Sequence, residues 1–181
     1  MSDFWVFGYG SLMWRPGFEH VETRKARLFG YHRALCITSH IHRGTVEKPG
    51  LVLGLDRGGS CLGLAFRVSQ TRRDEVMAYL RERELVTNVY HEKLLPLWLE
   101  AGEKVQAVTY VVDRRHEQYA GALDLDNAAE RVAGSRGLSG PNVDYVLNTL
   151  SHLHSLGIRD HWLEGVAARL TRDSVAPRPA P

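Results

Sequence analysis

The chain has 181 residues, of which 44% are hydrophobic and 24% charged, a composition typical of globular proteins and unlike that of disordered chains. Lys and Arg total 23 against 21 Asp and Glu, which leaves a formal net charge of +2. No block of like charges occurs, so we expect neither a nucleic-acid partner nor binding to a membrane surface. The length predicts one domain, which we place over residues 1–170, followed by a flexible tail over 171–181 that contains Pro177 and Pro179.

The cysteines and the N-terminal segment bear on the compartment. Cys36 and Cys61 lie in apolar stretches without CxxC spacing, which favours a thiol-reducing environment, with one buried disulfide as the alternative. The apolar run Phe4–Phe7 is too short for a signal sequence or a membrane span. We therefore expect a soluble, cytoplasmic protein.

The first half of the chain is predicted to be mostly β-structure. Short apolar and β-branched runs predict strands, in chain order, over Phe4–Phe7, Leu28–Thr38, Leu51–Leu55 and Cys61–Val68. The last two strands flank Asp56–Ser60, which contains Gly58 and Gly59, so we expect them to form a hairpin.

The second half begins with a change of period. Thr71 is the expected N-cap of an amphipathic helix that carries Asp74 and Glu75 in its first turn. A second hairpin is predicted from Tyr90–Leu99 and Val105–Val112. Three helices should follow, over Leu125–Ala133, from Pro141 to Gly157, and from an Asp160 cap to about Leu170. Strands followed by helices predict an α+β fold with a mainly antiparallel sheet that can curl into a barrel.

The glycine loop Gly8-Tyr9-Gly10-Ser11-Leu12 directly follows the first predicted strand. Its glycines allow a tight turn and let the amides of Gly10, Ser11 and Leu12 approach an anion. It is not a dinucleotide fingerprint, because Met13 stands where the third glycine is needed, and it lacks the GxSxG of a nucleophile elbow. An ordinary turn at the end of a strand is an equally weighted alternative.

Among the carboxylates, Glu84 is the strongest candidate for a general base. It follows Leu80 by four residues and Met77 by seven, so the helical period places it on the apolar face, whereas Glu75 and Glu82 fall on a charged face. Burial would raise its pKa toward the range of a general base. The alternative is that Glu84 reaches solvent or pairs with Arg81 or Arg83.

The nine histidines do not predict a metal site. His40 and His42 would share one side of a strand, but neither an HExxH motif nor cysteines at ligand spacing accompany them. Arg43 lies in a polar loop, where it could face solvent or clamp a substrate carboxylate. Tyr145 opens a predicted helix and either packs or directs its hydroxyl at a ligand.

Several segments together resemble the ChaC family of glutathione-specific γ-glutamylcyclotransferases. The resemblance extends in the same order over nearly the whole chain, and its segments are Trp5–Phe18, Gly30–Arg33, His42–Thr45, Glu47–Gly50, Arg83–Thr87, Gln118–Gly121, Gly140–Tyr145 and Leu156–Asp160. This chain departs from the family pattern at two places: it has Met13-Trp14-Arg15 where family members often have Ile-Trp-Lys, and Leu85 where Met is common. The stretch Asn88–Lys93 matches less closely.

The resemblance implies a γ-glutamylcyclotransferase-like mixed β-barrel with helices packed around it. It also implies a substrate-binding signature at Tyr9, Gly10, Ser11 and Leu12 and a catalytic glutamate at Glu84. Arg43 and Tyr145 are our further candidates, for holding the peptide end of the substrate and for orienting its γ-glutamyl group.

The implied reaction is the cleavage of glutathione to 5-oxoproline and cysteinylglycine. The γ-glutamyl α-amine attacks the γ-carbonyl of its own residue while Glu84 accepts a proton, so we expect no cofactor or metal. The loop amides would bind either the α-carboxylate or the oxyanion. We expect a monomer or homodimer.

Two rival functions remain at this point. The first is cyclisation of other γ-glutamyl amides or amines. The second is a non-catalytic anion-binding regulator linked to cation transport, which would need no ionisable group at position 84.

Overall fold

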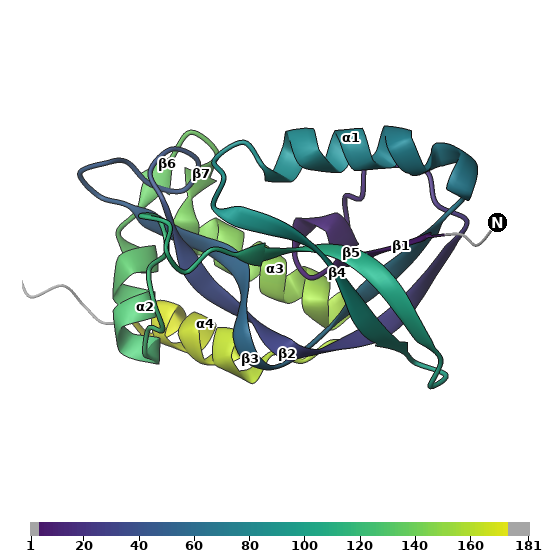
Figure 1. Cartoon of the computed structure of the whole chain (residues 1–181). Helices are drawn as coiled ribbons and strands as arrows, with labels where there is room; N and C mark the ends of the chain where they lie inside the picture. The colour runs from purple at the N-terminus through teal and green to yellow at the C-terminus, as the bar shows by residue number, and fades with distance from the viewer. Residues whose placement is uncertain (1–3, 174–181) are drawn as a thin grey trace, which may run out of the picture. The chain divides into compact units, whose positions relative to one another are not determined.

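Five strands close into a barrel in the order β1-β3-β2-β4-β5 in a computed structural model that describes residues 4–173 (Figure 1). The strands are β1 (Phe4–Gly8), β2 (Glu22–Ser39), β3 (Gly50–Val68), β4 (Tyr90–Leu99) and β5 (Lys104–Val112). β1 pairs antiparallel with β3 and parallel with β5, while β4 pairs antiparallel with β2 and β5. The expected mixed barrel with a mainly antiparallel sheet is confirmed.

The chain divides into two compact units. The first comprises residues up to Ala34 together with Leu53–Tyr119, and the second comprises Leu35–Val52 together with the chain from Ala120 onward. The second unit therefore takes in the C-terminal end of β2 and the N-terminal end of β3. That residues 1–170 behave as one domain stays a prediction.

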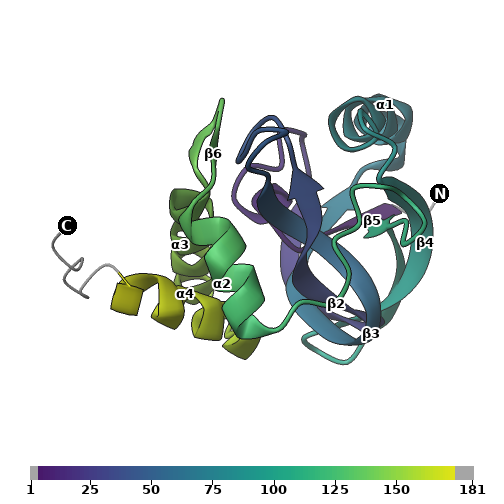
Figure 2. The same cartoon turned by 90° about the vertical axis from the view of Figure 1, so that its left-hand side faces the viewer.

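The helices of the second unit pack on one another. They are α2 (Leu125–Ala133), α3 (Asn142–Ser155) and α4 (His161–Asp173), with α4 against both of the others (Figure 2). Asp160 caps α4 as predicted, because its Oδ1 accepts from the Leu163 amide at 3.0 Å. α4 extends past Leu170, so the first residues of the predicted tail are helical, and the rest of that tail lies outside the described residues.

A short two-stranded sheet precedes α3, and the sequence did not predict it. Its strands are β6 (Arg136–Gly137) and β7 (Gly140–Pro141). Pro141 occupies the N-cap position of α3, one residue before the helix begins.

The predicted hairpin over Asp56–Ser60 is wrong, because this segment lies inside the single strand β3. Gly58 and Gly59 have φ values of 101° and 67°, which glycine adopts readily. These values produce a bend without reversing the strand. Nδ1 of His32 on β2 lies 2.9 Å from the Gly58 carbonyl oxygen, so the bend stays hydrogen-bonded to its neighbour.

The helix α1 (Arg73–Glu84) follows a 3₁₀ turn, η2 (Gln70–Arg72). The predicted N-cap at Thr71 is wrong: the cap position is Arg72, and no side chain caps it. Thr71 instead shares a hydrogen bond of 2.9 Å with the Ser69 hydroxyl. The buried face of α1 consists of Val76, Met77 and Leu80, as the period predicted.

The structure also bears on the expectations for two histidines, for the two cysteines and for a membrane span. His40 and His42 lie in bends after the end of β2, so the strand placement predicted for them is wrong. Cys36 and Cys61 are both buried, and neither is in a disulfide, so the alternative of a disulfide is wrong. None of the described helices is long and apolar enough to cross a membrane.

Candidate active site

The glycine loop leaves the end of β1 and enters a 3₁₀ turn, η1 (Ser11–Met13). The first hydrogen bond of this turn runs from the Met13 amide to the Gly10 carbonyl at 2.9 Å. The amides of Gly10, Ser11 and Leu12 precede it and are not used by the turn. A Cβ on Gly8 would lie 3.0 Å from the Leu12 Cβ, so the chain can turn this tightly only with a very small residue there.

Arg33 supports the loop from β2. Its side chain is buried, its Nε donates to the Tyr9 carbonyl at 2.6 Å, and its Nη2 donates to the Leu62 carbonyl at 2.7 Å. A buried guanidinium is costly unless its donors are satisfied, so these bonds fix the loop relative to β2 and β3. We did not select Arg33 as a site residue from the sequence. Its position inside the apolar run Leu28–Thr38 is the signal that could have marked it.

Arg83 holds the other side of the loop. Its Nη2 donates to the Ser11 hydroxyl at 2.9 Å, and its Nη1 donates to the Arg15 carbonyl at 2.6 Å and to the Tyr79 hydroxyl at 3.0 Å. The last turn of α1 is thereby attached to the glycine loop. The position next to Glu84 in sequence thus belongs to a residue that anchors the candidate substrate-binding segment.

Glu84 lies at the end of α1 with 18% of its side chain exposed. Burial raises the pKa of its carboxyl group, and the nearby Arg83 charge opposes that shift only in part. The Arg83 Nε is 3.3 Å from the Glu84 Oε1, whereas Arg81 makes two bonds of 2.9 and 2.8 Å to Glu92. The structure therefore combines both readings of the sequence: Glu84 is largely buried and also contacts Arg83.

The register of the barrel places the loop and Glu84 at one end of it. Val6 on β1 pairs in parallel with Val108 on β5, so Gly8, two residues on, is level with Tyr110. Burial raises the pKa of Tyr110, and the charges of Glu92 and Glu84 raise it further. Arg83, the residue before Glu84, donates to Ser11 in the loop, so the loop is attached to the helical turn that carries the carboxylate. Such an arrangement can hold an anionic group at the amides and accept a proton next to it.

Arg43 and Tyr145 both belong to the second unit, where the structure brings them together. The Arg43 guanidinium carbon is 5.3 Å from the centroid of the Tyr145 ring, and its Nη1 donates to the carbonyls of Ser139 at 2.7 Å and Pro141 at 3.3 Å. Arg43 thus ties the loop after β2 to the β6–β7 turn. Contact of either residue with substrate stays a prediction.

Of the histidines, His42 and His154 have side-chain partners in the protein, whereas the buried Nδ1 of His40 has no hydrogen-bond partner among the described residues. His42 Nδ1 is 3.0 Å from the Ser139 hydroxyl, and His154 Nε2 is 2.9 Å from a carboxylate oxygen of Glu164. Over residues 4–173, no group of three or more His, Cys, Asp or Glu side chains is placed to hold a metal ion.

Known structures identify the fold as that of the γ-glutamylcyclotransferases. A crystal structure of a γ-glutamylcyclotransferase specific to glutathione from yeast matches with a TM-score of 0.83 and 22% sequence identity, covering 95% of this chain and 97% of that one.

Sequence relatives define the family within that fold. The glutathione-specific γ-glutamylcyclotransferase of Escherichia coli is 35% identical over 163 residues, which cover 88% of this chain and 69% of the relative. That of Schizosaccharomyces pombe is 32% identical over 176 residues, covering 86% and 85%. A family model described as ChaC-like protein matches residues 4–172. The chain belongs to the ChaC-like family, as the motifs indicated.

Proposed function

We propose that this protein is a glutathione-specific γ-glutamylcyclotransferase that converts glutathione to 5-oxoproline and cysteinylglycine. The relatives in Escherichia coli and Schizosaccharomyces pombe carry that activity in their names. The observation that carries the proposal is a largely buried carboxylate of raised pKa, Glu84, on a helix anchored to a loop whose Gly10, Ser11 and Leu12 amides are not used by its 3₁₀ turn. A binding module would gain nothing from burying an ionisable group at this position.

The reaction needs one base and a folded substrate. Glu84 accepts a proton from the γ-glutamyl α-amine, whose nitrogen then forms a bond to the γ-carbonyl carbon of the same residue. The bond from that carbon to the cysteine nitrogen breaks, and the proton passes from Glu84 to the leaving nitrogen. No water is added, and holding the amine against the carbonyl in a near-attack geometry supplies much of the rate.

The glycine loop holds the γ-glutamyl end in this proposal. The amides of Gly10, Ser11 and Leu12 bind its α-carboxylate, with the Arg33 and Arg83 hydrogen bonds keeping them in place. The loop could bind the α-carboxylate or stabilise the oxyanion, and a substrate whose α-carboxylate is replaced by a carboxamide distinguishes these two roles. A higher KM at nearly unchanged kcat supports carboxylate binding, whereas a lower kcat supports stabilisation of the oxyanion.

The central experiment incubates the purified protein with glutathione and measures both products. We expect 5-oxoproline and cysteinylglycine in equal amounts. Binding of glutathione without product after long incubation would instead support the non-catalytic regulator. Competition between glutathione and other γ-glutamyl amides tests the remaining alternative, because a broader cyclotransferase would turn them over at similar kcat/KM.

We further propose that the protein acts in the cytoplasm, where thiols are kept reduced. Cys36 and Cys61, which are buried and not joined by a disulfide, support this setting. Cell fractionation followed by immunoblotting tests the compartment.

A further inference from the structure

A cavity of about 510 Å³ opens in the first unit between residues of four barrel strands. β2 contributes Tyr31 to its lining, β3 contributes Arg57, and β4 contributes His91 and Lys93. Val111 near the end of β5 and the segment that follows complete the wall. Its volume falls in the range of sites for small ligands.

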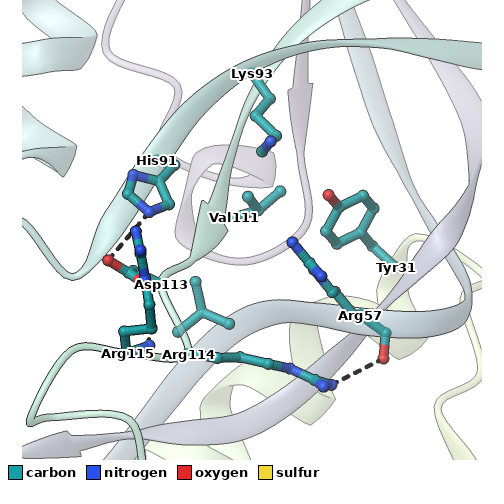
Figure 3. Close-up of a pocket in the computed structure, with 9 residues that line it drawn as sticks. Tyr31, Arg57, His91, Lys93, Val111, Asp113, Arg114 and Arg115 are labelled. Atoms are coloured by element: carbon teal, nitrogen blue, oxygen red, sulfur yellow. Dashed lines mark hydrogen bonds and ion pairs between the residues drawn. The ribbon is translucent and has the colours of Figure 1, made fainter.

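Two of the basic groups in this cavity are unpaired. The Asp113 carboxylate contacts the His91 ring at 3.1 Å and the Arg115 guanidinium at 3.5 Å. Among residues 4–173, neither the Lys93 ammonium nor the Arg57 guanidinium has a hydrogen-bond or ion-pair partner. Figure 3 shows these two groups and the Tyr31 hydroxyl directed into the same space, apart from the cluster around Asp113. The cavity therefore presents two uncompensated positive charges and a hydroxyl at one place.

The cavity lies at the same end of the barrel as the loop. His91 pairs with Val111 and Lys93 with Thr109, and the Thr109 hydroxyl donates at 3.2 Å to the carbonyl of Phe7, the residue directly before the loop. Tyr31 precedes Arg33 by two residues on β2, so both side chains are on one face of that strand. Tyr31 thus shares a face of β2 with Arg33, which fixes Tyr9, while Lys93 is opposite Thr109, which is hydrogen-bonded to the strand that leads into the loop.

We propose that this pocket binds the C-terminal carboxylate of the substrate's peptide part, with Lys93 and Arg57 as its charged partners and Tyr31 as a donor. Arginine and lysine both bind carboxylates through charge-assisted hydrogen bonds, and the arginine can do so through two parallel bonds. The proposal rests on the proposed function and explains its selectivity. A γ-glutamyl amine lacks the terminal carboxylate and would leave both cations unpaired, which a site of this kind rejects.

The test needs no variant at first: the wild-type protein is given glutathione and glutathione esterified at its glycine carboxylate. We expect kcat/KM for the ester to be lower by about tenfold or more, mainly through KM, because a charge-assisted bond is lost. Lys93→Met and Arg57→Met should each raise KM for glutathione by about tenfold with kcat within about twofold, and should leave the ester nearly unaffected. The preference for the free acid then shrinks in both variants.

Lys104→Met is the matched control. Lys104 lies on the same β4–β5 hairpin, with its ammonium 5.0 Å from the centroid of the Trp98 ring and away from the cavity. This variant should keep the wild-type KM for both substrates. Circular dichroism and melting temperatures verify that each variant is folded.

Three outcomes would overturn the assignment. They are equal kcat/KM for acid and ester in the wild type, an unchanged preference in both Lys93→Met and Arg57→Met, and loss of the preference in Arg43→Met alone. Each leaves the proposed function standing, because the wild type still forms 5-oxoproline from glutathione. Failure of the proposed function is distinct, since the wild type would then form no product from either compound.

Discussion

Glu84 and Glu164 are carboxylates of nearly equal exposure in the two units of the molecule, with 18% and 20% of their side chains accessible. Both contact an arginine, yet their pKa values shift in opposite directions. Hydrogen bonds from Arg159 and His154 lower the pKa of Glu164 to about 2, whereas burial raises that of Glu84.

The difference has two causes. Burial is the largest influence on the pKa of Glu84, whereas hydrogen bonds are the largest influence on that of Glu164, so the destinations of the arginine donors also matter. Arg159 donates to both oxygens of Glu164, at 2.5 and 2.9 Å. Arg83 donates through its terminal nitrogens to Ser11, Arg15 and Tyr79, so Glu84 receives only the attraction of a nearby charge. A neighbouring arginine therefore does not by itself keep a carboxylate acidic, because its hydrogen bonds carry most of the effect.

The largest expected effect is that of Glu84→Gln. If Glu84 is the general base, product formation should fall about 10²- to 10⁴-fold. The melting temperature should rise at neutral pH, because a carboxyl of raised pKa is stabilising only while protonated and costs stability as the pH rises through its folded-state pKa. Product assays and thermal melts measure the two effects. Near-wild-type turnover would remove Glu84 from the mechanism.

Arg83→Met should have the next largest effect. It releases Ser11 and the Arg15 carbonyl, so we expect kcat/KM to fall by about tenfold or more. Because Arg83 opposes the upward shift of the Glu84 pKa, the acid limb of the pH profile should move to higher pH. Arg72→Met, which breaks exposed ion pairs with Glu19 and Glu75 at the other end of α1, is the control and should change neither quantity. An unshifted limb would mean that Arg83 does not act on Glu84.

The wild-type pH profile sharpens the comparison without a mutation. A base must be deprotonated to act, so kcat/KM should decrease as the pH falls through the raised pKa of Glu84, above the ordinary value of 4.5. Initial rates of 5-oxoproline formation between acidic and neutral pH measure the limb. A limb at or below the ordinary value would contradict the role of burial.

Glu164→Gln should give the smallest effect and the opposite sign. A lowered pKa stabilises the fold above the unfolded-state value of 4.5, and this contribution is lost as the pH falls toward about 2. The variant should therefore melt slightly below the wild type at neutral pH, with the gap closing in acid, while turnover stays unchanged. A gap that is constant with pH would show that the ion pairs of Glu164 do not contribute.

The sequence was sufficient to find Glu84 but not to explain its behaviour. The spacing to Met77 and Leu80 is local, and a helix converts it directly into burial. The partners of Arg83 are on a loop far away in sequence, and no period relates them to α1. The family motifs covered the segments of Arg33 and Arg83 without indicating that both hold one loop.

Two other features show the same limit. Gly58 and Gly59 predict a turn locally, but pairing with β2 keeps them inside a strand. Lys93 is on β4 and Arg57 on β3, and the long-range pairing that places β2 between these strands brings them to one cavity. Local patterns specify elements and faces, while long-range pairing decides which charges meet.

Neighbouring side chains at the end of α1 have different surroundings: Arg81 pairs with Glu92, Arg83 bonds to the glycine loop, and Glu84 is largely buried. One residue turns an α-helix by about 100°, so a single insertion or deletion within α1 would reassign every one of these contacts at once. A designer who transfers this site to another scaffold should therefore preserve the rotational phase of the helix before the identity of its other side chains.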